Sequence, residues 1–364
     1  MRLPRPARAL LAAAAAAAAC LAGPARAAAP ARPAADPDAM REARRAAPSG
    51  RYASGRAVGH YLAARLKAAR GDLVGAAEEL RLAAAYDDGS AELHAAHAEA
   101  LAMTGRLDAA AAAARRALAL DGEGRAATAA HVLLARLHAA RREPGPALQA
   151  LDAAMAVEAG RAAAGERADA EPWRLAAEQR LAAGDADGAL RVLDDGVKRI
   201  GSDGVGYREL GRALLERGDL PRAERALRLA VERSRVDVEA LRLLADVHEA
   251  LRRPKEARDD LLALLHLEPE DPDALLGMGR LALLDDDLPA AREWFSRHLA
   301  TPGAGWEAHL RVASEWLEAR HPEEALAAAR AGLALPGAGP RLRLAEGLAL
   351  QAARRWDESA RALE

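Results

Sequence analysis

Residues 207–240 read YRELGRALLERGDLPRAERALRLAVERSRVDVEA, and this stretch decides the fold. Its first half is helix-forming and carries one small residue, Gly211, on an otherwise large-residue face. Gly218 and Asp219 then mark a turn, because glycine tolerates the left-handed conformation that ends a helix and aspartate caps the next one. Pro221 follows in the first turn of a second helix, where a missing N–H costs nothing. The stretch predicts a helix–turn–helix hairpin of 34 residues.

The same unit recurs along the chain from about residue 57. Most copies carry an alanine followed four residues later by a larger apolar side chain, as in Ala223 and Leu227. A second marker, a small residue (alanine or glycine), stands twelve residues before this alanine. Because two helices approach closely only where side chains are small, we expect this residue to form the contact between the two helices of each pair. It occupies nine positions: Ala64, Ala98, Ala135, Ala177, Gly211, Ala245, Gly279, Ala313 and Gly347.

This pattern resembles the tetratricopeptide repeat, whose consensus is W-x2-L-G-x2-Y…A-x3-F…P over 34 residues. The best copy consists of Tyr207-x2-Leu210-Gly211-x2-Leu214 and Ala223-x3-Leu227. Most copies lack the tyrosine and the closing proline, but the period and the small residues persist. The resemblance covers roughly residues 57–364 and implies an all-α, right-handed solenoid of about nine antiparallel helix pairs, the last one incomplete.

Two irregular intervals divide the predicted array. Three extra residues fall near Asp121–Ala127 and eight near Ala159–Ala168, both between pairs, where longer loops are tolerated. We therefore expect a block of three pairs over 57–158, a linker over 159–169 and a block of six pairs over 170–364. In the last pair, we expect Trp356 and Leu363 to be poorly covered.

The N-terminal 27 residues have the layout of a secretory signal peptide. Three arginines precede an uncharged run over Ala9–Gly23, and Ala25-Arg26-Ala27 supplies a small-residue cleavage site. We expect the mature chain to begin at Ala28, without a transmembrane span, because the run is short and weakly apolar. The Ala/Pro-rich residues 28–56 are expected to form a flexible spacer. The composition, rich in Ala, Arg and Gly, points to a bacterial source, and the cleaved signal peptide then predicts a periplasmic or secreted protein.

Cys20, the single cysteine, leaves an alternative open. Ala17-Ala18-Ala19-Cys20 resembles a lipoprotein processing site, at which the cysteine is lipidated and becomes the first residue. The usual leucine three places earlier is absent, and the residues that follow are apolar. The chain is then either a soluble exported protein or a lipoprotein anchored through Cys20.

Composition and motifs argue against catalysis and nucleic-acid binding. Lys and Arg number 52 against 54 Asp and Glu, whereas nucleic-acid binding proteins usually carry a basic excess. The chain contains no phosphate-binding glycine loop and no nucleophile elbow. His60, His94, His131 and His309 share the fourth place of their repeats, but no carboxylate or thiolate completes a metal site, and packing is the favoured interpretation. We expect no catalytic residue, cofactor or metal.

Two functions remain open for such a chain. One is a protein-binding scaffold of the cell envelope; the other is an accessory arm of a separate envelope enzyme or of secretion or polysaccharide machinery. In the resembling family the first helix of each pair lines a concave groove that receives a peptide. Six arginines fall at the corresponding places here: Arg136, Arg174, Arg208, Arg212, Arg242 and Arg280. They suit an acidic protein or peptide partner, whereas the alternative is an internal stripe of ion pairs with carboxylates such as Glu178, Glu209 and Asp246.

Overall fold

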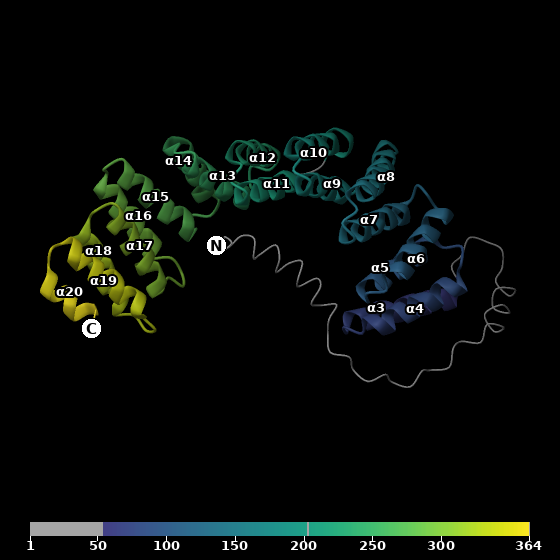
Figure 1. Ribbon diagram of the computed structural model, residues 1–364, viewed down its shortest axis with the longest axis horizontal. Coiled ribbons are helices and arrows are strands. Elements are labelled where there is room, and N and C mark those ends of the chain that lie inside the picture. Colours follow the sequence, from purple (N-terminus) through teal and green to yellow (C-terminus); the bar gives the residue numbers. More distant parts are fainter. Residues whose placement is uncertain (1–53, 202–203, 364) are drawn as a thin grey trace. The chain divides into compact units, whose positions relative to one another are not determined.

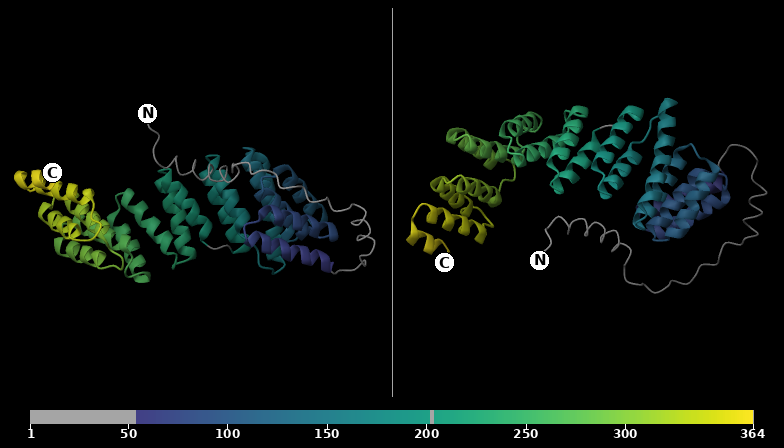
Figure 2. Two further views of the ribbon diagram at one scale, coloured as in Figure 1. Left: turned by 90° about the horizontal axis from the view of Figure 1, so that it is seen from below. Right: turned by 45° about the horizontal axis from the view of Figure 1, so that its top comes forward.

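The computed structural model describes residues 54–201 and 204–363. In these residues the regular structure consists entirely of α-helices, which confirms the all-α prediction. They form consecutive pairs joined by tight turns, stacked pair on pair within each part of the chain (Figures 1 and 2). The predicted signal peptide, Cys20 and most of the predicted spacer lie outside the described residues.

The structure divides the chain into two compact units, with the boundary between Gly206 and Tyr207 at the start of α11. We describe each unit by itself. The first unit contains α3 Gly55–Ala69, α4 Leu73–Tyr86, α5 Ala91–Met103, α6 Leu107–Leu120, α7 Arg125–Ala140, α8 Pro144–Ala163, α9 Glu171–Ala182 and α10 Ala186–Ile200.

The second unit begins with most of α11 Val205–Glu216. It continues with α12 Leu220–Arg233, α13 Val238–Ala250, α14 Pro254–Leu267, α15 Pro272–Leu284, α16 Leu288–Leu299, α17 Trp306–Glu318, α18 Pro322–Leu333, α19 Pro340–Ala352 and α20 Trp356–Leu363. Among the described residues these helices complete nine pairs, the number predicted from the sequence.

The small residues of the repeat lie where the two helices of a pair touch. A β-carbon added to Gly211 would stand 2.5 Å from Leu227, and one added to Gly279 would stand 2.3 Å from the ring of Phe295. Both distances are shorter than real carbon contacts, so a β-carbon at either position would have to displace the side chain of Leu227 or Phe295. The aligned alanines at Ala64, Ala98, Ala135, Ala177, Ala245 and Ala313 are all buried. The predicted contact is confirmed.

The turn signals also act as predicted. Asp72, Asp185, Asp219 and Asp287 each accept a hydrogen bond from a backbone N–H three residues later, at 2.7–3.4 Å. This arrangement satisfies one of the N–H groups that a helix start leaves without a partner. Proline occupies the first turn of five second helices: α8, α12, α14, α16 and α18.

Two predicted boundaries need correction. The first helix begins at Gly55, two residues before the expected start of the array, because Ser54 already accepts the first helical hydrogen bond from Val58 N–H. The expected linker over 159–169 is partly helical, since α8 continues to Ala163. Its extra turn is held by a buried ion pair described below. The division into blocks at this linker stays a prediction, because the compact units separate after Gly206 instead.

The cores are built largely from alanine and leucine, as expected from the composition. Where the structure describes the chain, no helix combines the length and apolar character needed to cross a bilayer. In the last pair Leu363 contacts Gly347, yet it remains 46% exposed, and Trp356 is 63% exposed. Their poor coverage was predicted and is confirmed.

Candidate functional site

A cavity of about 880 Å³ opens in the first unit beside the extra turn of α8. Its walls come from the start of α7, the end of α8, the loop that leads into α9, the first turns of α9 and the end of α10. Ala129, Val132 and Ile200 supply apolar wall, and Arg174 is the one predicted groove arginine that lines it. Volumes of this size are typical of ligand sites.

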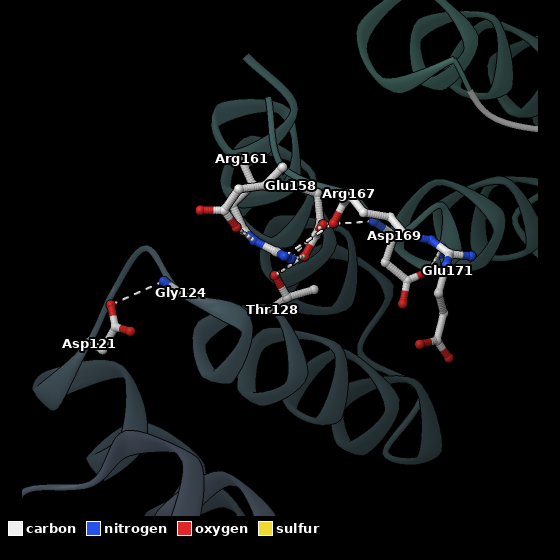
Figure 3. A network of polar contacts seen from close by, with 9 residues as sticks. Asp121, Gly124, Thr128, Glu158, Arg161, Arg167, Asp169 and Glu171 are labelled. Atoms are coloured by element: carbon white, nitrogen blue, oxygen red, sulfur yellow. Dashed lines mark hydrogen bonds and ion pairs between the residues drawn. The ribbon is translucent and has the colours of Figure 1, made fainter. Parts of the chain in front are cut away.

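The floor of the cavity is a buried ion pair between Glu158 and Arg161, one helical turn apart on α8 (Figure 3). Glu158 is 1% exposed and accepts hydrogen bonds from Arg161 Nη1 at 2.8 and 3.0 Å. It also accepts from the Thr128 hydroxyl of α7 at 2.6 Å and from the backbone N–H of Asp169 at 2.7 Å. One carboxylate thus joins two helices and the loop.

Arg161 completes the network from the opposite side. Its Nε donates to Glu166 at 3.0 Å, and its Nη2 donates to the backbone carbonyl of Arg167 at 3.1 Å. Burial alone would lower the pKa of Arg161, but the hydrogen bonds that it donates to Glu166 and Glu158 raise this pKa above its ordinary value. Arg161 therefore stays charged, and both charges of the buried pair are compensated.

In the second unit the predicted groove arginines join successive repeats. Arg208 on α11 donates to Asp237 at 2.7 Å, and Asp237 in turn caps α13. Arg242 on α13 pairs in the same way with Asp271, which caps α15. Each arginine thus reaches the first residue of the next pair, 29 positions ahead in the chain.

Three further predicted arginines also have carboxylate partners. Arg212 pairs with Glu239, and Arg280 pairs with Glu249 and, at 3.2 Å, with Glu315. Arg136 in the first unit donates to Glu171 at 2.5 Å. These partners lie mostly in neighbouring repeats and differ from the Glu178, Glu209 and Asp246 expected from the sequence. The arrangement fits an ion-pair stripe, and binding of an acidic ligand at these arginines stays a prediction.

Comparison with known families identifies the repeat. A family model described as tetratricopeptide repeat matches residues 208–265 and again residues 250–308. The chain carries tetratricopeptide repeats. The matched segments include the copy whose spacing most resembled the consensus. No curated protein matches the chain.

Solved tetratricopeptide repeat structures are similar to this chain at low sequence identity. The C-terminal part of a repeat-containing protein from Cytophaga hutchinsonii has 14% identity and a TM-score of 0.49, with 69% of this chain and 98% of that one covered. A repeat protein from Parabacteroides merdae has 12% identity and a TM-score of 0.38, with 82% and 100% covered. TTC0263 from Thermus thermophilus has 21% identity and a TM-score of 0.36, with 50% and 100% covered.

Two of the four histidines at the fourth place of their repeats, His60 and His94, have ordinary packing partners. His60 stacks on Tyr86 with ring centroids 5.4 Å apart and contacts Glu79 at 2.7 Å. His94 lies 3.2 Å from the carbonyl oxygen of Asp88. Over residues 54–201 and 204–363, no three side chains of His, Cys, Asp or Glu are grouped as metal ligands would be. These contacts fit the packing interpretation.

Sequence reasoning missed the cavity because it treated the insertion as loop length only. A signal was present: Glu158 and Arg161 are oppositely charged and three residues apart, at the end of a helix that the repeat period alone would have ended earlier. Spacing of this kind places the two side chains next to each other on a helix. Their burial, however, depends on Thr128, which lies 30 residues earlier in the chain.

Proposed function

We propose that this chain is a non-catalytic scaffold of the bacterial cell envelope and that it binds a protein partner through its tetratricopeptide repeats. Stacked repeats offer extended surfaces that suit polypeptide ligands better than small substrates. The observation that carries the proposal is the cavity of the first unit. First helices α7 and α9 contribute to it, and it combines apolar wall with ionisable side chains at its rim.

The envelope part of the proposal is supported by the N-terminal sequence. Arginines, an uncharged run and the Ala25-Arg26-Ala27 site have the order that export signals require. The natural chain, purified from cells, is expected to begin at Ala28 when sequenced from its N-terminus. A lipidated start at Cys20 would replace the soluble form by an anchored one, and an uncleaved cytoplasmic chain would overturn the envelope assignment.

Protein binding is tested by cross-linking in living cells. A photo-reactive residue replaces Ala129, which is exposed and lines the cavity, or Ala112, which is exposed on the second helix α6. Both are alanines on helices of the same unit, so the two variants form a matched pair. We expect a discrete protein adduct from position 129 and none from position 112. Equal adducts from both positions, or none from either, would contradict a partner-binding cavity.

A further inference from the structure

The outward face of α3 carries a stripe of large apolar side chains that nothing in the described part of the chain covers. Val58, Leu62 and Leu66 are 44%, 61% and 53% exposed. Because they are spaced four residues apart on a helix, the three side chains lie along one face. α3 is the first helix of the first unit and packs chiefly on α4 (Figure 1). The residue of α5 that corresponds to Leu66, Ala100, is buried in a cluster with Leu80 of α4. The stripe thus occupies a face that the preceding helix covers in the next repeat.

The charges on α3 are all of one sign. From residue 55 to residue 70 the sequence contains four basic residues and no carboxylate. Lys67 is paired with Glu79 of α4 at 2.6 Å. Arg65 and Arg70, by contrast, are exposed and form no ion pair with any residue that the structure describes. In a helix with 3.6 residues per turn, Arg65 lies on one side of the apolar stripe and Arg70 on the other. α3 therefore presents an apolar centre between two cations.

The first turn of α3 differs from the first turns of most later first helices. Five of those helices have a carboxylate at the place that Val58 occupies in α3: Glu92, Glu171, Glu239, Asp273 and Glu307. A carboxylate at this place is stabilised by the positive end of the helix dipole. α3 has no acidic residue in its first turn, so it lacks this stabilisation and exposes Val58 instead. The departure from the repeat removes negative charge and adds apolar surface on the same face.

We propose that α3 binds the surface of an anionic lipid bilayer and lies in the plane of the interface. Val58, Leu62 and Leu66 enter the boundary between headgroups and acyl chains, and the two flanking arginines extend to the lipid phosphates. Basic residues close to an anionic membrane surface each strengthen such binding. The contact is reversible, since one short amphipathic helix is a single membrane signal. The proposal goes beyond the proposed function, because partner binding in the cavity of the first unit does not require it.

Two other occupants of this face are disfavoured by charge. A second copy of the chain would bring its own Arg65 and Arg70 against the same two cations, and like charges repel. The residues that precede α3 would also add positive charge, since residues 28–53 contain five arginines and three carboxylates. A bilayer that contains phosphatidylglycerol instead offers phosphates together with apolar chains. Lipid is therefore the surface that matches both the stripe and its flanking cations.

The test measures flotation of the full chain, purified from cells, with lipid vesicles. Every form carries Cys20→Ser, so no lipid anchor contributes, and all forms share the same N-terminus. One set of vesicles contains phosphatidylcholine mixed with phosphatidylglycerol, and the other contains phosphatidylcholine alone. The apolar variant is Leu62→Gln, Leu66→Gln, and the charge variant is Arg65→Gln, Arg70→Gln. All four side chains are exposed and glutamine favours helix, and circular dichroism confirms that both variants are folded.

We expect the chain with an unchanged α3 to float with the anionic vesicles and not with phosphatidylcholine alone. Each α3 variant should bind the anionic vesicles at least about tenfold less tightly, because it loses either apolar contact or attraction to phosphate. The matched control is Leu344→Gln, Leu348→Gln in α19, where two leucines at the same spacing are 52% and 45% exposed. This control should bind as tightly as the chain with an unchanged α3.

A fluorophore that is sensitive to polarity identifies the face that meets the lipid. Attached to Val58→Cys, it should shift its emission to shorter wavelength when anionic vesicles are added. Attached to Arg115→Cys, on the exposed face of α6, it should keep its emission unchanged. Equal shifts at both positions would contradict an orientation set by α3.

Three further results would overturn the inference: no flotation with anionic vesicles, flotation that both α3 variants retain, or an equal loss in the α19 control. Self-association that the apolar variant abolishes, without flotation, would make this face a contact between copies and would overturn the inference as well. None of these results changes what the cross-linker at Ala129 captures in cells. Failure of the lipid site is therefore distinguishable from failure of the proposed function.

Discussion

In the described residues, each of the nine turns between paired helices contains one residue with a left-handed backbone. Only four of these nine residues are glycine. Gly71, Gly105, Gly184 and Gly218 have φ between 76° and 86°. The other five turns use Arg142, Arg252, Asp286, Arg320 and Arg354, with φ between 57° and 64°. A side chain in this region contacts the following carbonyl, so these five positions carry strain that glycine would relieve.

Replacement of Arg252 or Arg320 by glycine is expected to stabilise the second unit. Strain relief of roughly 1–2 kcal/mol per residue exceeds the roughly 0.5–1 kcal/mol of added chain entropy, so each change should raise the free energy of unfolding by about 0.5–1 kcal/mol. Urea unfolding followed by circular dichroism measures this quantity. Gly218→Ala serves as the reverse control and should lower it. A loss of stability in both arginine variants would show that their side chains contribute contacts.

His97 on α5 makes the first unit sensitive to acid. Burial, with the nearby His94, Arg106 and Arg81 cations, lowers the pKa of His97 to about 4, against the opposing charge of Glu78. The unfolded chain protonates this imidazole below its ordinary pKa of 6.5, whereas the native chain does so only near 4. The neutral imidazole of His97 therefore contributes its full share of stability above pH 6.5. As the pH falls toward 4, this share is lost, and the free energy of unfolding decreases by at most roughly 3 kcal/mol.

An NMR titration of the imidazole resonances checks this prediction. The signal missing from His97→Gln identifies the residue, and its midpoint in the natural chain should fall well below 6. The same variant should lose less stability than the natural chain between pH 7 and pH 4.5. A midpoint near 6.5 would contradict the burial argument.

At the scale of one element, α8 shows how a buried charge pair extends a helix beyond its repeat. Arg161→Met should cost about 3–5 kcal/mol, because Glu158 would keep a buried charge without its main partner. Changing both residues, with Glu158→Leu added, should recover part of this loss, since no charge then stays buried. Arg115→Met on the exposed face of α6 is the control and should change little. Urea unfolding measures all three; a double variant less stable than the single one would contradict the prediction.

The elements themselves were largely predictable from the sequence. Gly218, Asp219 and Pro221 set the limits of the helices through local chemistry, and Gly211 marks a contact with Leu227 within the same hairpin. The cavity was not predictable, because it depends on contacts between pairs: Thr128 meets Glu158 only after α7 and α8 have folded together. The partners of the groove arginines were missed for the same reason, since Arg208 reaches Asp237 in the next repeat.

At the scale of the whole molecule, the chain should not unfold as one cooperative body. Repeat arrays are held by contacts between neighbours, and the boundary between the two compact units falls in the sequence between Gly206 and Tyr207. The sequence instead predicts that the array divides at the linker over residues 159–169. Trp173 lies between these two candidate breaks, and it is the only tryptophan before Tyr207. It is 1% exposed and donates to Asp195 at 3.2 Å, so its fluorescence should report local unfolding.

The experiment follows Trp173 in a chain whose other four tryptophans are replaced by phenylalanine. A fluorophore on Arg115→Cys, with Cys20 changed to serine, reports α6. We expect the Trp173 signal and the fluorophore signal to change at the same urea concentration, as the boundary at Gly206 requires. In a second variant, Trp173→Phe, the remaining tryptophans all lie in the second unit, and we expect them to report a separate transition. If Trp173 follows the second unit instead, the break lies at 159–169.

The ion pairs between repeats in the second unit bear on how such a chain can lengthen or shorten. Arg208 with Asp237 and Arg242 with Asp271 are copies of one contact with the same 29-residue offset inside a 34-residue period. If one whole period were removed, for example residues 209–242, Arg208 would stand at that same offset from Asp271. The junction would then reproduce a bond that already exists. A gene encoding this segment can therefore gain or lose a unit by unequal recombination while this ion pair is kept at the new junction, so the number of repeats can vary without loss of the contact.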